Sequence, residues 1–487
     1  MAELLQDEIM SITPEDIVTG PHIMDIVSSG MYNDPMMVLR EFIQNSTDSI
    51  DQAIISGNLS INEAEIAIQI NGRARTITVH DNGNGVPNNK VKRTLCSIAA
   101  SEKTKGMGRG FRGIGRLGAL GYCDELMFRT KAKGDPKIAE VVWDAKTLRS
   151  HLELNQESDV SDILSKSIRI GYENTNEREN CFFEVTMIGV KHFHDDTLMH
   201  IPSIKSYLSL NAPVPFNPDF LFRDKIEQHI QSMSCYKTYR VMINGKQIFK
   251  PHTNSYRINS KRDEQIKDTK MFVFFDKTRQ IEIAKGWYAV TNFESSIPKS
   301  VLMRGIIVRQ GNILIGGDSF LADYFSEKRF STWCVGEIHV SNRVKVNARR
   351  DGFEHTEDME ALTEQFGLLG GHLSKLFRTT SMIRSRKNTE DQLGRRIECF
   401  SNQPVVIDEK HKNELINLIR KSNHLNPDEI IKKITLFEDL YNRKRLVTLD
   451  AEEIVKKIVE IFKDDKFTAL QSSELITRFA DALFVDY

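Results

Sequence analysis

The sequence lacks the features that mark several common classes of protein. No run approaches 18 consecutive apolar residues, so we expect no membrane-spanning helix and no membrane partner. Met1 to Glu8 are acidic and have no apolar signal core, which predicts a cytoplasmic location. Cysteine is scarce: the chain has 6 among 487 residues and no C-x-x-C pair. We therefore predict reduced thiols, and neither a disulfide framework nor a zinc site.

An excess of one charge is also absent. Lys plus Arg total 66 and Asp plus Glu total 67, which gives a formal net charge of −1. The chain as a whole therefore lacks the basic character of a nucleic-acid coat protein. Two short basic runs, Arg384–Lys387 and Arg443–Arg445, could contact phosphates locally, but solvated helix ends explain them more simply.

The length of the chain and changes in its residue pattern predict three domains. Residues 1–205 mix helical periods with short strands, residues 206–380 are rich in strand signals, and residues 381–487 have almost no glycine and a helical period. The clearest strand signals of the middle region are Tyr239–Ile243 before the turn Asn244-Gly245, Ile281–Ala284 and Gly305–Arg309.

The first motif is a helix predicted over residues 35–50, with Asp34 as its N-cap and Pro35 in its first turn. At about 100° per residue, Glu41, Asn45 and Asp48 share one face. The opposite face is apolar and consists of Leu39, Phe42, Ile43, Ile50 and Ile54. The polar face is either solvated or lines a pocket. In a pocket, Glu41 could deprotonate a water molecule and Asn45 could offer an oxygen to Mg²⁺.

The second motif is a β-hairpin around Asn71-Gly72 whose second strand runs into Asp81-Asn82-Gly83-Asn84-Gly85. An aspartate at a strand end can accept a hydrogen bond from an exocyclic amine such as that of adenine. Gly83 and Gly85 would allow the backbone to approach a flat base and to adopt positive φ. The alternative interpretation is an ordinary tight turn.

The third motif is a glycine-rich segment, residues 101–121, which contains seven glycines. Exposed backbone amides and the basic side chains before Gly113 suit a polyphosphate. A flexible surface loop would explain the glycines, but not the apolar residues between them, Phe111, Ile114, Leu117 and Leu120. The chain has no G-x-x-x-x-G-K-[ST] sequence, so a P-loop is excluded.

In this order and spacing, the three motifs resemble the GHKL ATPase superfamily, which includes the ninety-kilodalton heat-shock chaperones, type II topoisomerases, histidine kinases, MutL and the MORC ATPases. The resemblance covers roughly residues 15–190. It implies an α+β protein with a Bergerat-fold α/β sandwich ATPase domain, followed by an α/β transducer-like domain and a helical C-terminal region.

The resemblance also implies roles for individual residues. Glu41 would be the general base, Asn45 the Mg²⁺ ligand, Asp48 a pocket residue and Asp81 the partner of the adenine amine, with Gly83 and Gly85 shaping the base pocket. Cys181 or Thr186 would take the place of the family's late-strand Gly-Thr, with Thr186 as the assigned nucleotide contact. Arg350, beside Arg349, would reach the γ-phosphate from the transducer. The phosphates would be held by a set of lid residues: Gly110, Phe111, Arg112, Gly113, Ile114, Gly115 and Gly118.

The function that the resemblance implies is a conformational switch that binds ATP and Mg²⁺, hydrolyses ATP, forms a homodimer on ATP binding and controls a protein partner or client. The alternative is a DNA-associated clamp like MutL or MORC, with a role in prokaryotic defence left open. A histidine kinase is disfavoured, because His22 is the only histidine before residue 36 that could serve as an acceptor.

Overall fold

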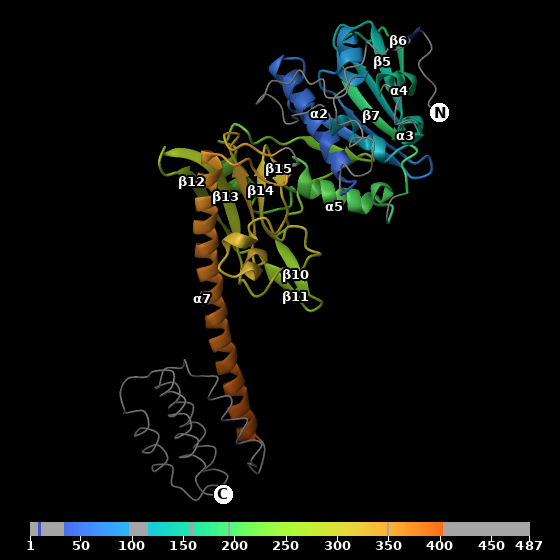
Figure 1. Ribbon diagram of the computed structural model, residues 1–487. Coiled ribbons are helices and arrows are strands. Elements are labelled where there is room, and N and C mark those ends of the chain that lie inside the picture. Colours follow the sequence, from blue (N-terminus) through green and yellow to red (C-terminus); the bar gives the residue numbers. More distant parts are fainter. Residues whose placement is uncertain are drawn as a thin grey trace, which may run out of the picture. The chain divides into compact units, whose positions relative to one another are not determined.

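The computed structural model describes residues 8–10, 34–96, 115–154, 160–192, 195–347 and 350–402. The chain divides into two compact units between Gly371 and His372, inside the long helix α7 (Glu357–Asn402) (Figure 1). The three β-sheets described below belong to the first unit.

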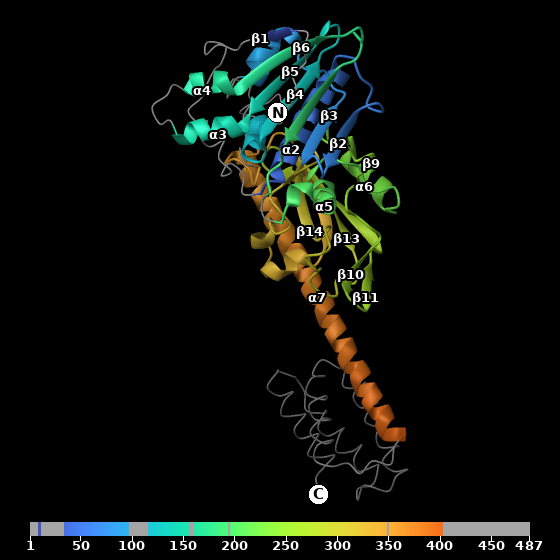
Figure 2. The ribbon, with the colours of Figure 1, turned by 90° about the vertical axis from the view of Figure 1, so that its right-hand side faces the viewer.

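The first sheet has nine strands in the order β1-β6-β5-β4-β7-β3-β2-β8-β9, and Figure 2 shows its central strands side by side. All neighbours are antiparallel except β2 and β8, which run parallel. The strands are β1 (Glu8–Met10), β2 (Glu65–Asn71), β3 (Thr76–Asp81), β4 (Glu125–Lys131), β5 (Lys137–Asp144), β6 (Ile168–Asn174), β7 (Phe182–Ile188), β8 (Arg240–Ile243) and β9 (Lys246–Gln247).

Alternation along these strands gives the sheet one apolar face and one polar face. In β2 and β3 every second residue is buried, so that Ile66, Ile68, Ile77 and Val79 enter one core with the apolar side chains of helix α2 (Met37–Ile55). The same core includes residues of four further helices: α3 (Ala145–Leu154), α4 (Val160–Ser167), α5 (Ile201–Asn211) and the 3₁₀-helix η4 (Gly115–Gly121). Three short helical turns also occur in this region: η2 (Asn88–Lys90), η3 (Lys92–Cys96) and η5 (Thr197–Met199).

Helix α2 confirms the predicted apolar face, since Leu39, Phe42, Ile43 and Ile50 are buried. The predicted N-cap is wrong by two residues, because the helix begins at Met37. Asp34 nevertheless accepts a hydrogen bond from the Met36 amide through Oδ1 (2.9 Å), and its carbonyl oxygen accepts the Met37 amide. A turn closed by Asp34 therefore leads into the helix.

The second sheet has five strands in the order β12-β13-β16-β14-β15, with β14 and β16 parallel. These strands are β12 (Asp268–Asp276), β13 (Ile281–Val290), β14 (Gly305–Gln310), β15 (Ile313–Ile315) and β16 (Val335–Val340). The other elements of this region are helix α6 (Arg223–Ile230), the two-stranded sheet of β10 (Ser255–Asn259) and β11 (Arg262–Gln265), and the 3₁₀-helices η6 (Ala322–Tyr324) and η7 (Lys328–Thr332).

The second sheet buries a group of charged side chains around Glu337. One carboxylate oxygen of Glu337 accepts hydrogen bonds from Lys250 Nζ (2.7 Å) and His339 Nε2 (2.9 Å), and the other accepts from Arg309 Nε (2.8 Å). The side chains of Glu337, Lys250 and Arg309 have no exposed surface. Burial alone raises the pKa of Glu337, but Arg309, Lys250 and the hydrogen bond from His339 outweigh it and hold that pKa well below its ordinary value.

The structure confirms the predicted α+β class with an antiparallel-rich sheet. The strands predicted at Tyr239–Ile243 and Gly305–Arg309 are present to within one residue, and the strand predicted at Ile281–Ala284 begins as predicted and continues to Val290. The bounds of the three domains stay predictions. Strands β8 and β9 lie beyond residue 205 and nevertheless complete the first sheet. Most of the predicted helical tail lies outside the described residues. None of the helices that the structure describes is both long and apolar enough to cross a membrane.

Candidate functional site

The polar face of α2 is largely enclosed. Asp48 is buried, and Glu41 and Asn45 are half-buried. The Glu41 side chain keeps only 15% of its surface exposed, and its Oε1 lies 3.6 Å from Nη2 of the equally enclosed Arg40. A solvated helix face would leave these side chains open to water, so their burial argues against that interpretation of this face.

Asp81 ends strand β3 on the face that α2 covers, and it is fully buried. Its Oδ1 accepts the Gly83 amide (3.0 Å). Its Oδ2 is buried and forms no hydrogen bond of ordinary geometry within the described part of the chain. Burial raises the pKa of Asp81 to about 6, against the opposing effects of the Ser46 hydroxyl, the Gly83 amide and the Ser49 hydroxyl. A buried acceptor without a donor is costly unless a ligand supplies the missing hydrogen bond.

Close contacts with neighbouring atoms require glycine at positions 83 and 85, shortly after Asp81. A Cβ on Gly83 would lie 2.2 Å from Ser49 Oγ. Gly85 has φ +63°, and a Cβ there would lie 2.2 Å from the carbonyl oxygen of Lys131. The Asp81–Gly85 loop therefore packs directly on α2 and on the end of β4, which fixes the position of the Asp81 carboxylate.

Gly85→Ala should destabilise the protein by at least about 2 kcal/mol, because it combines a left-handed φ with a clash against backbone. Gly134→Ala is the matched control, since Gly134 has φ +82° but open space around its Cβ position, and it should cost only about 1 kcal/mol. Thermal unfolding of the two variants measures the difference. Equal losses would show that the close contact with Lys131 contributes nothing.

Thr186 does not lie beside Asp81. It pairs with Thr78 across β3 and β7, and the two hydroxyls are 3.0 Å apart on the face of the sheet opposite to α2. The Thr186 hydroxyl, which we predicted to lie beside Asp81, is therefore on the opposite face of the sheet from Asp81. Cys181, the other candidate, lies just before β7. On the Asp81 face, Thr130 of β4 is buried; its Oγ1 accepts the Val86 amide (2.8 Å) and donates to the Phe182 carbonyl (3.0 Å), which anchors the loop after Gly85.

Two further groups of predicted residues are those of the phosphate lid and Arg350. Gly110, Phe111, Arg112, Gly113 and Ile114 of the predicted phosphate lid lie outside the described residues, whereas Gly115 and Gly118 belong to η4, which packs against α2. Arg350 follows β16 in a turn; it has φ +57°, its amide donates to the Asn347 carbonyl (3.1 Å) and its carbonyl accepts the Gly316 amide (3.3 Å). The proposed reach of Arg350 to a phosphate stays a prediction.

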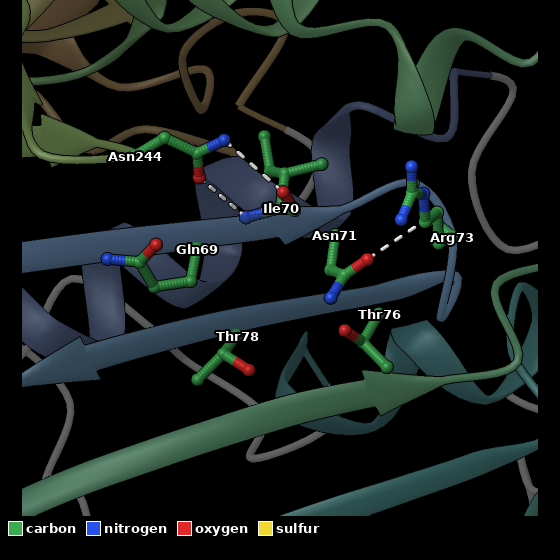
Figure 3. Close-up of a pocket in the computed structure, with 8 residues that line it drawn as sticks. Gln69, Ile70, Asn71, Arg73, Thr76, Thr78 and Asn244 are labelled. Carbon is green, nitrogen blue, oxygen red and sulfur yellow. Dashed lines mark hydrogen bonds between the residues drawn. The ribbon is translucent and has the colours of Figure 1, made fainter.

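A hollow of about 720 Å³ lies on the other face of the first sheet. It is lined by the β2–β3 hairpin and by Asn244, whose side chain pairs with the backbone of Ile70 (2.8 and 3.2 Å) (Figure 3). Thr76 and Thr78 line this hollow and point away from the side of the sheet that carries Asp81. The hollow is therefore distinct from the candidate site.

Sequence reasoning missed three polar residues of α2 that lie at this site. Ser46 and Ser49 both act on Asp81, and the buried Gln44 has no hydrogen bond on either amide atom among the described residues. The helical period could have indicated Ser49, which lies one residue beyond Asp48 and four beyond Asn45. No group of three or more His, Cys, Asp or Glu side chains able to hold a metal occurs in the described ranges. Asn45 remains the proposed metal ligand of this face.

Comparison with known proteins agrees with this geometry. The family described as histidine kinase-, DNA gyrase B- and HSP90-like ATPase matches residues 32–169, which include α2, Asp81 and the glycine-rich segment. The chain is also similar to the chaperone protein HtpG of several bacteria. It is 27% identical to HtpG of Legionella pneumophila (strain Lens) over 142 residues, which cover 26% of this chain and 23% of the relative.

Other HtpG proteins give comparable matches. The identity to that of Vibrio atlanticus is 26% over 175 residues, 32% of this chain and 28% of the relative. The identity to that of Geobacter metallireducens is 28% over 142 residues, 25% of this chain and 22% of the relative. The chain thus matches about a quarter of the length of these curated relatives.

Proposed function

We propose that the chain binds ATP and hydrolyses it as a conformational switch, because residues 32–169 match the histidine kinase-, DNA gyrase B- and HSP90-like ATPase family and the chain is similar to HtpG, which supports a place in the GHKL ATPase superfamily. The observation that carries the proposal is the enclosed polar face of α2, with Glu41, Asn45 and Asp48, beside a fully buried carboxylate at Asp81 that retains an unused acceptor. This arrangement suits a ligand with an amine at one end and phosphates at the other.

Each side chain has a task in this proposal. Asp81 accepts a hydrogen bond from the adenine amine through Oδ2, and the Gly83 amide holds its Oδ1 in place. Glu41 takes a proton from the attacking water, and the neighbouring Arg40 guanidinium orients its carboxylate. Asn45 would hold Mg²⁺, which neutralises charge on the phosphates when it is bound. The buried setting of Glu41 keeps competing water away from the reacting atoms.

The switch requires a path from α2 to the second sheet, and one set of contacts supports it. Asp51 near the end of α2 accepts a hydrogen bond from the Tyr239 hydroxyl (2.6 Å) and lies 3.0 Å from Lys237 Nζ. The Lys237 carbonyl in turn accepts a hydrogen bond from Asn312, which lies between β14 and β15 (3.1 Å). We propose that ATP binding acts through this contact and through Arg350 on a homodimer and on a protein partner or client.

The proposal is tested by measuring ATP affinity and phosphate release on the full chain with Mg²⁺. Absence of ATP binding at any Mg²⁺ concentration would refute it. Binding of ATP without hydrolysis would support the proposed nucleotide site and contradict the proposed catalytic role of Glu41.

The affinity for ATP should depend on pH through Asp81. The adenine amine donates to the ionised carboxylate, and burial places the pKa of Asp81 at about 6, so affinity should fall as pH falls through 6. At pH 5 the loss should be about tenfold relative to pH 7.5. Calorimetry at the two pH values measures it. The triphosphate of 6-chloropurine riboside, which lacks the amine, reports the background from phosphate titration; an equal loss for both nucleotides would contradict the Asp81 contact.

A further inference from the structure

The turn between β14 and β15 contains a buried asparagine in a conformation that few residues adopt. Gln310 pairs with Ile313, so the turn consists of Gly311 and Asn312, and both have positive φ (+56° and +62°). This is the geometry of a two-residue hairpin turn, which asparagine tolerates at a small cost. Turns usually lie at the surface of a protein, whereas Asn312 is fully buried. The tip of this hairpin is therefore inserted between other segments of the chain.

The Asn312 side chain binds two of these segments. Its Nδ2 donates to the carbonyl oxygens of Lys237 (3.1 Å) and Val214 (3.4 Å), both outside its own hairpin. The side chains of Lys237 and Tyr239 contact Asp51 near the end of α2 (3.0 and 2.6 Å). The carboxamide of Asn312 therefore connects the second sheet to the segment that contacts the end of α2.

The backbone of the same turn is fixed to the buried charges of the second sheet. The Asn312 carbonyl accepts a hydrogen bond from Arg309 Nη1 (3.3 Å), and Arg309 Nε donates to Glu337 (2.8 Å). The side chains of Arg309 and Glu337 have no exposed surface, and a low local dielectric strengthens hydrogen bonds between such charged groups. The turn is thus held firmly from both sides.

Strand β15 leads from this turn directly to the turn that contains Arg350. The strand residues Ile313–Ile315 are buried, and the next amide, that of Gly316, donates to the Arg350 carbonyl (3.3 Å). Phe320, whose ring packs against Gly316, also contacts Phe353 of the Arg350 hairpin edge-on (6.3 Å between ring centres). Four residues of extended chain span about 13 Å at most, so β15 is a short connection between the two turns.

We propose that Asn312 is a positioning residue for ATP hydrolysis, which sets through β15 where the Arg350 turn lies relative to α2. This inference rests on the proposed function, because the position of Arg350 matters only for a nucleotide bound beside Glu41. A guanidinium stabilises phosphate charge from hydrogen-bonding distance, and a displacement of about 1 Å can cost about 10²-fold in rate. Loss of the Asn312 contacts should therefore slow hydrolysis without weakening the binding of ATP.

The test uses Asn312→Gly, which removes the side chain and keeps a residue that adopts positive φ without strain. On the full chain with Mg²⁺, single-turnover phosphate release should fall about 10- to 100-fold, while ATP affinity measured by calorimetry stays within about twofold of the wild-type value. Asn244→Gly is the matched control. Asn244 also has positive φ (+46°) in a hairpin turn, and its side chain forms two hydrogen bonds to the backbone of Ile70, but it belongs to the first sheet. This control should leave both quantities within about twofold.

A second background separates positioning from general damage to the fold. Arg350→Ala should lower the rate at least as much as Asn312→Gly, and Asn312→Gly added to Arg350→Ala should lower it no further. A structural defect would lower the rate by the same factor in both backgrounds, and that result would overturn the proposal. If Asn312→Gly is unfolded at the assay temperature, Tyr239→Phe breaks the same connection by removing the hydroxyl bound to Asp51, and the same pattern is expected.

The remaining results separate this inference from the proposed function. If Asn312→Gly releases phosphate at the wild-type rate, or loses affinity for ATP as strongly as rate, Asn312 has no positioning role. If Arg350→Ala hydrolyses ATP at the wild-type rate, β15 leads to no residue of the reaction, and the inference fails while the proposed function stands. If the wild-type chain releases no phosphate from ATP, the proposed hydrolysis and this inference fail together.

Discussion

Glu41→Ala is expected to lower the rate of phosphate release by about 10² to 10⁴ while ATP binding stays within a few-fold of the wild-type value. In the proposed mechanism a general base acts on the attacking water, whereas other groups, among them Asp81, hold the nucleotide. Single-turnover release of labelled phosphate gives the rate, and calorimetry gives the affinity. The separation of the two quantities identifies a residue that acts in the transition state rather than in binding.

Two further variants test whether the effect of Glu41→Ala comes from the loss of a base. Glu41→Gln keeps the size and the hydrogen-bonding capacity of the side chain and should lose hydrolysis to the same degree, because the amide is not a base. Arg40→Ala removes the cation 3.6 Å from Glu41 but leaves the carboxylate, so it should retain measurable hydrolysis. Equal losses of affinity and rate in Glu41→Ala would contradict the role of a base and would indicate a structural defect.

Glu337→Gln should destabilise the second sheet by about 3–5 kcal/mol, because it leaves the buried Arg309 guanidinium without a counter-charge and removes the acceptor of Lys250, whose pKa burial lowers to about 7. The measurement is chemical denaturation followed by tryptophan fluorescence in a Trp143→Phe background. Of the three tryptophans in the chain, only Trp287 and Trp333 then remain, and both belong to the region of the second sheet.

Lys250→Met is the matched comparison and should cost far less than Glu337→Gln. It leaves Glu337 with Arg309 and His339, so that one anion still faces one cation. The Lys250 ammonium group lies 4.3 Å from the centre of the Phe216 ring, in a setting that accepts an apolar methionine side chain. Losses of similar size in the two variants would show that the number of uncompensated charges does not decide stability here.

The sequence predicts the local features of the site well, because they depend on short-range rules. The helical period separates the buried Leu39 and Phe42 from the polar Glu41, and the Asn-Gly pairs mark both hairpins. Thr186 was misplaced because the face of a strand changes with every residue, and the register of β7 is set by its pairing with β3 and β4. The action of Ser46 and Ser49 on Asp81 and the network around Glu337 depend on side chains distant in sequence, which no local pattern contains.

The parallel pairing of β8 with β2 affects how the region that carries the candidate site can be isolated. A fragment ending at residue 205 would leave β2 as a bare edge whose unpaired amides and carbonyls invite association with other chains. It would also remove Tyr239 and Lys237, the two partners of Asp51. An expression boundary placed beyond Gln247 keeps β8 and β9 paired on that side of the sheet, so precipitation of a shorter fragment would reflect the exposed edge and not the properties of the intact protein.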